Sequence, residues 1–347
     1  MSVRSKSTRK APANGAPAAR KAKPKSSPVL TPKTQKVFGQ LEKCLGIPFV
    51  AYWTSTGGSI CQNDVMAMSR LLENVQGSKL GLFVKSDGGN PEAALRMIHL
   101  LRHRFRHLTL FAPFECASAA TMIALGANEI HMGPTSYLTA VDTSFKHQLS
   151  PLDSGNDLVS VSQDEVMRIL KLWHVEKQRD NPYPELYKYL HPLVIGALDR
   201  SSSLSIRICK ELLGYHLRDT RKANRISKDL NSSYPSHSYP ITAREAKRLG
   251  LNVKPLEGEV NDLLLELNGL YSNMAQPLLT DYDEENYHNN EICNILELPG
   301  RQIFYQIEKD WHYRREERRW VSLNDKSRWK SLTPRGRGWQ AETIFIR

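Results

Sequence analysis

The sequence of 347 residues contains little cysteine and no long hydrophobic run. Its five cysteines are odd in number and widely spaced, with no Cys-x-x-Cys pair, which argues against a disulfide scaffold and a zinc ribbon. No stretch approaches the roughly 20 apolar residues of a membrane-spanning helix, and the N-terminus lacks the apolar segment of a signal peptide. We therefore expect a soluble, cytoplasmic protein without a membrane span.

Acidic residues are missing from the first 36 residues, which hold ten Lys or Arg. This segment also has almost no large apolar side chains, so burial cannot offset the entropy lost on ordering, and we predict a disordered basic tail over 1–36. Residues 301–347 hold twelve basic against six acidic residues, whereas 37–300 hold 26 against 30. Because the middle of the chain is mildly acidic, it is not built as a surface for nucleic acid.

From residue 47 onward, short apolar runs alternate with helical periodicity, which is typical of an α/β fold with a mostly parallel sheet. The pattern predicts strands over 47–53, 79–84, 107–112, 129–132 and 137–141, and helices over 63–75, 91–103 and 118–125. It then predicts helices over 163–178, 185–189, 192–216, 241–249 and 261–271, the fourth of them opened by a Thr242/Glu245 capping box. We predict an α/β domain with a helical arm over 37–272, followed over 273–347 by an acidic linker and a basic, Trp-rich extension.

Two loops between a strand and a helix have the residues that an oxyanion site needs. In the first, Gly88 and Gly89 precede a helix that begins with proline, so their N–H groups can face a ligand oxygen beside a positive helix end. In the second, Ser118 stands at a helix start, with the N–H of Ala119 next to it. A plain tight turn and an N-cap serine are the simpler interpretations of these two loops. Both loops follow parallel strands, so we expect them to meet in one crevice.

The sequences SDGGN at 86–90 and CASAATMIALGANEIHMGPTSYLTAVD at 116–142 resemble the active-site segments of the Clp protease and crotonase superfamily. HSYPIT at 237–242, with EA at 245–246 and LGL at 249–251, resembles more closely the serine dehydrogenase proteinase family, which is related to signal peptide peptidase A. The resemblance covers about residues 47–255, some 60% of the chain. It implies a repeated β-β-α core with a helical arm, and assembly into a homo-oligomer.

The resemblance also implies roles for individual residues. Ser118 corresponds to the nucleophile, and the backbone N–H groups of Gly88 or Gly89 and of Ala119 correspond to the oxyanion hole. Such a serine needs a base within hydrogen-bond reach and donors already aimed at the developing charge.

The base is less evident, because the segment that ends at Asp142 lacks the histidine of the Clp proteases. His237 is our first choice, with Asp142 as the group that orients it. Lys146 is the alternative, in a Ser-Lys dyad like that of signal peptide peptidases. Lys85, His147 and the lack of any base remain open.

We therefore predict an ATP-independent serine hydrolase, a peptidase that acts on peptides or proteins through a Ser118 acyl-enzyme, without metal or cofactor. No P-loop motif is present. The alternative from another class is a catalytically inactive scaffold that binds partners through its basic tails. A crotonase-like site for acyl-coenzyme A is disfavoured, because the late motif matches the peptidase branch.

Three further features have simpler interpretations. Cys116, two residues before Ser118, is interpreted as a small buried thiol. The acidic run 281–288 lacks the order of an EF-hand and is interpreted as a solvated loop. The C-terminal segment carries four of the six tryptophans among many arginines, and we expect a strand and helix that dock the tryptophans on the acidic core, within or between subunits, in preference to a nucleic-acid site.

Overall fold

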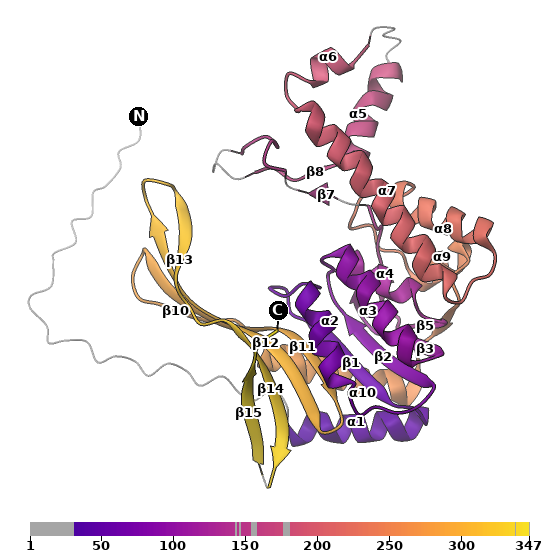
Figure 1. Ribbon diagram of the computed structural model, residues 1–347, viewed down its shortest axis with the longest axis vertical. Helices are drawn as coiled ribbons and strands as arrows, with labels where there is room; N and C mark the ends of the chain where they lie inside the picture. Colours follow the sequence, from indigo (N-terminus) through magenta and orange to yellow (C-terminus); the bar gives the residue numbers. More distant parts are fainter. Residues whose placement is uncertain are drawn as a thin grey trace, which may run out of the picture.

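The computed structural model describes residues 31–346 apart from 143, 146, 154–157, 176–180 and 337. Residues 1–30 of the predicted tail therefore lie outside the described residues. Within the described part, the largest feature is a mixed sheet of 11 strands (Figure 1). Its parallel half runs in the spatial order β1 (Phe49–Thr54), β2 (Lys79–Lys85), β3 (His107–Ala112), β5 (Glu129–Met132) and β9 (Val253–Pro255).

The other half of the sheet is antiparallel and consists of C-terminal strands. Strand β11 pairs with β1, and the order continues outward through β12, β14 and β15. The bounds are β10 (Leu278–Asp281), β11 (Asn286–Leu298), β12 (Arg301–Arg314), β13 (Arg319–Asp325), β14 (Arg328–Arg335) and β15 (Gly338–Ile344). The structure thus has antiparallel strands where the sequence analysis expected a terminal helix. The apolar residues of β11 and β12 complete the core sheet, and Trp329 on β14 is only 5% exposed.

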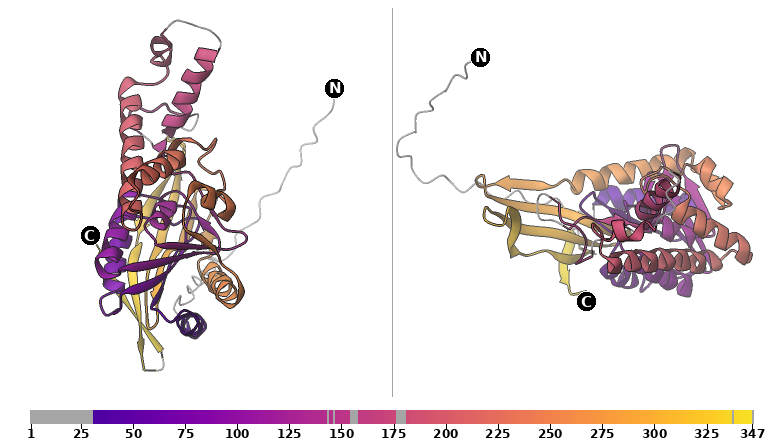
Figure 2. Two further views of the ribbon diagram at one scale, coloured as in Figure 1. Left: turned by 90° about the vertical axis from the view of Figure 1, so that its right-hand side faces the viewer. Right: turned by 90° about the horizontal axis from the view of Figure 1, so that it is seen from above.

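Helices cover both faces of the parallel half (Figure 2). Residues such as Val50, Leu82 and Val84 face α2 (Gln62–Leu71), α3 (Pro91–Arg104), α4 (Ala119–Leu125), α7 (Pro192–Gly214) and α8 (Thr220–Ser232). Their neighbours, Phe49 and Phe83 among them, face α1 (Pro32–Leu45) and α10 (Gly258–Met274). Because both faces are buried, the strands read as continuous apolar runs, which confirms the α/β prediction.

Short segments after the strands form a second ladder. Strand β4 (Glu115–Cys116) pairs with β6 (Tyr137–Leu138), and single bridges extend this pairing from Ser86 to Cys116 and from Leu138 to Ile241. A further bridge joins Ile60 to Gly89. The repeating unit of the fold therefore consists of a strand in the large sheet, a short segment in the second ladder and a helix. This arrangement confirms the predicted repeated β-β-α core and places both glycine and serine loops in the ladder.

The helical part extends away from the sheet (Figure 1). It comprises the short strands β7 (Ser144–Phe145) and β8 (Val161–Ser162) and the helices α5 (Gln163–Val175), α6 (Tyr183–Leu186) and α7, followed by α8 and α9 (Ala243–Leu249). Val166, Leu170 and Val194 belong to a small apolar cluster of its own. The Thr242/Glu245 capping box does not form, because the Thr242 side chain makes no cap hydrogen bond and Glu245 instead pairs with Arg248. Among the described residues, no helix combines the length and apolarity needed to cross a membrane.

Helix α1 begins inside the predicted tail, and a buried carboxylate anchors it to the core. Glu297 on β11 accepts hydrogen bonds from Thr34 Oγ1 (2.7 Å) and Gln35 Nε2 (2.8 Å) of α1. It also accepts hydrogen bonds from Tyr271 Oη of α10 (2.7 Å) and Gln302 Nε2 of β12 (2.6 Å). The local start signals are the N-cap Thr31, which forms a capping box with Thr34, and Pro32 at the first helical position, whereas the partner that anchors the helix lies more than 260 residues away.

We expect Glu297→Leu to lower the free energy of unfolding by about 3 kcal/mol or more, because four buried donors lose their acceptor. Burial raises the pKa of Glu297 to about 7 from 4.5. Protonation of Glu297 therefore contributes its full share to the free energy of unfolding below pH 4.5, and this contribution is lost as pH rises through about 7. Denaturant unfolding of wild type, Glu297→Leu and Glu297→Gln measures both effects. An unchanged midpoint for the Leu variant, or the same pH slope in the Gln variant, contradicts this account.

Candidate active site

Ser118 has a backbone conformation that serine rarely adopts. It stands immediately before α4 with φ 53° and ψ −117°, and its side chain makes no capping hydrogen bond. Left-handed φ values in non-glycine residues cost energy and persist only where surrounding contacts enforce them. The simpler interpretation as an N-cap serine is therefore wrong, and the hydroxyl is not used to stabilise the helix.

Two threonines hold this strained residue in place. The Ser118 N–H donates to Thr139 Oγ1 at 2.7 Å. The Thr139 N–H in turn donates to Thr121 Oγ1 at 3.0 Å, and the Thr121 hydroxyl donates to the Cys116 carbonyl at 2.7 Å. Both threonines are buried. Sequence reasoning did not find this role, because a buried threonine has no signature that separates it from an ordinary core residue.

The double glycine packs directly against Ser118. Gly88 and Gly89 have φ values of 112° and 149°. A Cβ on Gly88 would lie 2.6 Å from Ser118 Cβ and 3.2 Å from the Ala119 nitrogen, so the two predicted loops are in contact. A Cβ on Gly89 would lie 2.4 Å from the Ile60 carbonyl oxygen. Glycine is thus required at both positions by close approach as well as by φ.

Two backbone N–H groups of these adjoining loops are unpaired within the described residues. Gly88 N–H donates to Ser86 Oγ at 3.1 Å. Across the described part of the chain, Gly89 N–H and Ala119 N–H have no protein acceptor. Ala119 is the first residue of α4, where helix geometry leaves the N–H unpaired and the local potential positive. These groups can therefore donate to an anionic oxygen.

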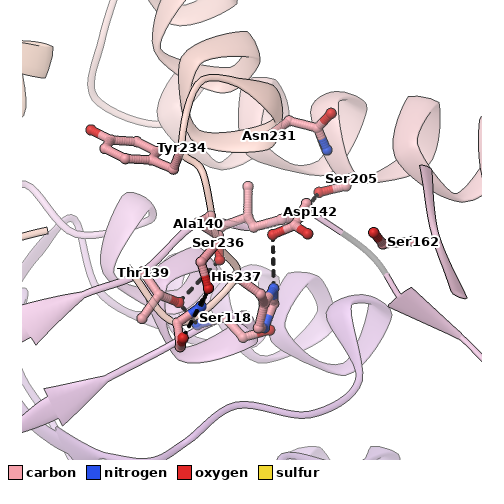
Figure 3. A network of polar contacts seen from close by, with 12 residues as sticks. Ser118, Thr139, Ala140, Asp142, Ser162, Ser205, Asn231, Tyr234, Ser236 and His237 are labelled. Atoms are coloured by element: carbon pink, nitrogen blue, oxygen red, sulfur yellow. Dashed lines mark hydrogen bonds and ion pairs between the residues drawn. The ribbon is translucent and has the colours of Figure 1, made fainter. Parts of the chain in front are cut away.

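The loop that connects α8 to α9 brings His237 to Asp142. Leu138 and Ile241 exchange both backbone hydrogen bonds, at 3.0 and 2.8 Å, in an antiparallel bridge. Continuing that register by four residues on each side places Asp142 opposite His237. Asp142 Oδ1 lies 2.8 Å from His237 Nδ1 (Figure 3).

This contact determines the chemistry of the imidazole. The hydrogen bond that His237 Nδ1–H donates to Asp142 is the largest effect on the imidazole and raises its pKa, against burial, which lowers it. With Nδ1 bonded to the carboxylate, Nε2 is the nitrogen available to exchange a proton. Among the described contacts, no hydrogen bond joins Ser118 Oγ to His237. The two residues are connected indirectly: Ser118 N–H is bonded to Thr139, and the backbone from Thr139 leads to Asp142, which contacts His237.

The strand segment that carries Asp142 is held by the helical part. Val141 N–H donates to the Leu230 carbonyl of α8 at 2.9 Å, and Ser205 Oγ of α7 donates to the Val141 carbonyl at 2.5 Å. Figure 3 shows Ser205, Asn231 and Asp142 together with Ser118 and His237. Helix α8, which the sequence analysis did not predict, thus contributes to the position of the acid.

The other candidate bases have different surroundings. Lys85 is buried, and its ammonium lies 2.8 Å from Glu115 Oε1 and donates to the Thr54 carbonyl at 3.0 Å. His147 Nδ1 accepts a hydrogen bond from Leu149 N–H at 3.1 Å within a turn. Lys146 lies outside the described residues. Lys85 thus forms an ion pair with Glu115 of β4, whereas His237 is paired with Asp142.

Cys116 lies two residues before Ser118 in the sequence. Cys116 is fully buried, and burial raises the pKa of its thiol well above the usual range, which confirms the prediction of a buried thiol. Within the described residues, no group of three His, Cys, Asp or Glu side chains has the arrangement of a metal site.

No protein-family model matches the sequence. A curated relative, an uncharacterized protein of Methanocaldococcus jannaschii, is 24% identical over 188 residues, or 54% of this chain, and the chain spans only 58% of that relative's length. Similar solved structures include two variants of the 1510-N membrane-bound stomatin-specific protease, both with a TM-score of 0.38. The first is 14% identical and the match covers 63% of this chain and 84% of that one. The second, in complex with a substrate peptide, is 16% identical and the match covers 63% of this chain and 79% of that one. Another is ClpP1 from Listeria monocytogenes (TM-score 0.35, 17% identity, 65% and 96%). We therefore base a function on the geometry of the site.

Proposed function

We propose that the protein is a serine hydrolase with Ser118 as nucleophile, His237 as general base and Asp142 as the residue that orients His237. The observation that carries this proposal is the strained Ser118, packed on Gly88 and hydrogen-bonded into the strand segment that leads to the Asp142–His237 pair. A left-handed serine at the start of a buried helix destabilises the fold and serves no capping purpose. Strain of this kind is typical of a nucleophile.

The proposed reaction begins when Ser118 Oγ attacks a substrate carbonyl carbon and its proton passes to His237 Nε2. The carbonyl oxygen becomes an oxyanion that accepts hydrogen bonds from Ala119 N–H and Gly89 N–H, since Gly88 N–H is bonded to Ser86 Oγ. The bond to the leaving group then breaks, and His237 returns its proton to that group. Water hydrolyses the Ser118 ester by the same two steps, with His237 again as base, and releases the acid.

We propose peptides or proteins as substrates and membership of the serine dehydrogenase proteinase family, both on the resemblance of the segments around Ser118 and His237. We further propose that hydrolysis needs no ATP, metal or cofactor. The acid–base pair and the backbone donors would supply proton transfer and charge stabilisation without any added group.

A fluorophosphonate probe tests the proposal, because it reacts only with an activated serine. We expect one adduct per chain by intact mass, located on Ser118 by peptide mapping, and no adduct on Ser118→Ala. Ser233→Ala, which changes an exposed serine at the end of α8, should label like wild type. An adduct on folded Ser118→Ala, or none on wild type across pH 6 to 9, overturns the assignment. Digestion of a fluorogenic peptide library then tests the substrate class.

A further inference from the structure

The far ends of the C-terminal strands form an arm that projects from the core (Figures 1 and 2). In this arm β10 pairs with β11, β11 with β12, and β12 with β13, all antiparallel. Six of the seven residues of β13 are exposed. The arm is therefore a sheet with two solvent-facing surfaces, and each surface can be read from the strand register.

One surface, the aromatic face, carries apolar side chains in register. Tyr287 lies opposite Trp311, and Tyr313 lies opposite Trp320. Leu279 lies opposite Asn289, two residues along β11 from Tyr287 and therefore on the same face. The Tyr287 ring centroid lies 4.7 Å from that of Trp320 and 6.2 Å from that of Trp311, and Tyr313 lies 5.4 Å from Trp320. Leu279 is 59% and Trp320 41% exposed. An antiparallel sheet with one apolar face usually packs that face on another layer.

The opposite surface, the polar face, is satisfied within the chain. His288 Nδ1 lies 2.7 Å from Asp310 Oδ1, and His312 Nδ1 lies 2.9 Å from Asn286 Oδ1. The polar face can therefore remain in water.

On the aromatic face, by contrast, two buried polar atoms, Trp311 Nε1 and Asn289 Oδ1, have no hydrogen-bond partner among the described residues. Buried polar atoms are rarely left unpaired. Both atoms are already buried within one chain, so the face is incomplete only in the apolar contact that its exposed side chains Leu279 and Trp320 could make.

The two turns of the arm carry opposite charges. The β10–β11 turn is acidic, with Asp281, Asp283, Glu284 and Glu285. The β12–β13 turn is net basic, with Arg314, Arg315, Arg318 and Arg319 against two glutamates. An Arg315–Glu285 ion pair already joins the two turns within one chain. A two-fold axis would place the acidic turn of one copy beside the basic turn of the other, so the arm is electrostatically complementary to itself.

We propose that the aromatic face of this arm binds the same face of a second copy of the chain. Sheet-on-sheet packing buries Tyr287, Trp311 and Trp320 of both copies. The sequence of residues 1–30 has almost no apolar side chains to cover such a face. A nucleic acid would stack on the aromatic rings but would be repelled by the acidic turn.

Sedimentation equilibrium of the full chain at 1 to 50 µM tests this proposal. Wild type should have at least twice the 39.4 kDa chain mass, and Trp320→Glu should have half the wild-type mass. Val321→Glu is the matched control, because it introduces the same charge one residue along β13 on the polar face, and it should retain the wild-type mass. Circular dichroism verifies that both variants are folded. A monomeric wild type, or equal masses for both variants, overturns the proposal, as does association that requires an added oligonucleotide.

Charge reversal gives a second test that does not depend on apolar packing. Asp283→Lys with Glu284→Lys removes the net negative charge of the β10–β11 turn and leaves the β12–β13 turn basic, whereas Arg315→Glu with Arg318→Glu makes both turns acidic. Each double variant alone should dissociate at least tenfold more readily than wild type. An equimolar mixture should restore association between unlike chains, detected by differently tagged chains. Failure of the mixture to associate contradicts a two-fold interface with crossed turns.

Discussion

Replacement of His237 by alanine is expected to lower the rate of fluorophosphonate labelling of Ser118 by roughly 10²- to 10⁴-fold, the typical contribution of a general base. Without His237 Nε2, the Ser118 proton loses its proposed acceptor, and Lys85 is held in an ion pair with Glu115. Protein folding should be unaffected, since the His237 side chain is 45% exposed. Labelling kinetics by intact mass, with His147→Ala as the control, measure the effect. A His237→Ala rate within tenfold of wild type would sink the assignment of the base.

The pH profile then separates the acid from a merely structural residue. Only neutral imidazole accepts a proton, so the wild-type rate should rise as pH increases through the raised pKa of His237. Asp142→Asn removes the hydrogen bond and charge that raise this pKa, while burial still lowers it. The midpoint should therefore move to lower pH, and the plateau rate should fall because the tautomer is no longer fixed. An unchanged midpoint in a folded Asp142→Asn variant contradicts the orienting role.

Gly88→Ala should reduce labelling of Ser118 by about 10³-fold, because it disturbs the nucleophile and the oxyanion donors together. The new Cβ would meet Ser118 Cβ at 2.6 Å and the Ala117 carbonyl oxygen at 2.9 Å, and alanine strongly disfavours a φ of 112°. Gly269→Ala is the matched control, since its Cβ meets nothing within 4 Å on α10.

The control should label like wild type and unfold at an equal or higher temperature. If Gly88→Ala is folded by circular dichroism and labels at the wild-type rate, the double glycine has no part in the reaction. If Gly88→Ala loses both folding and labelling, limited proteolysis of Gly88→Ala and Gly88→Ser locates the damage. Damage confined to the ladder gives a cut near residue 88 before the whole protein unfolds.

Local sequence determined much of the core. The predicted strands 107–112 and 129–132 coincide with β3 and β5, and the helix predicted over 91–103 differs from α3 by one residue. These elements have continuous apolar runs or a proline start, signals that depend only on near neighbours. The same holds for the double glycine, because its left-handed backbone is a property of the residue type.

Other features were decided only by contacts between distant segments. Helix α1 starts at Pro32 behind the local N-cap Thr31 but is anchored to the core by the Thr34–Glu297 hydrogen bond, and the C-terminal strands belong to the core because β11 pairs with β1. The Asp142–His237 contact joins residues 95 positions apart through the register of one short bridge. Composition and periodicity indicate whether a segment faces solvent or the core. They do not indicate which distant segment it contacts. The sequence by itself therefore determined the chemistry available to this protein, and the tertiary structure decided which of its candidate groups stand together.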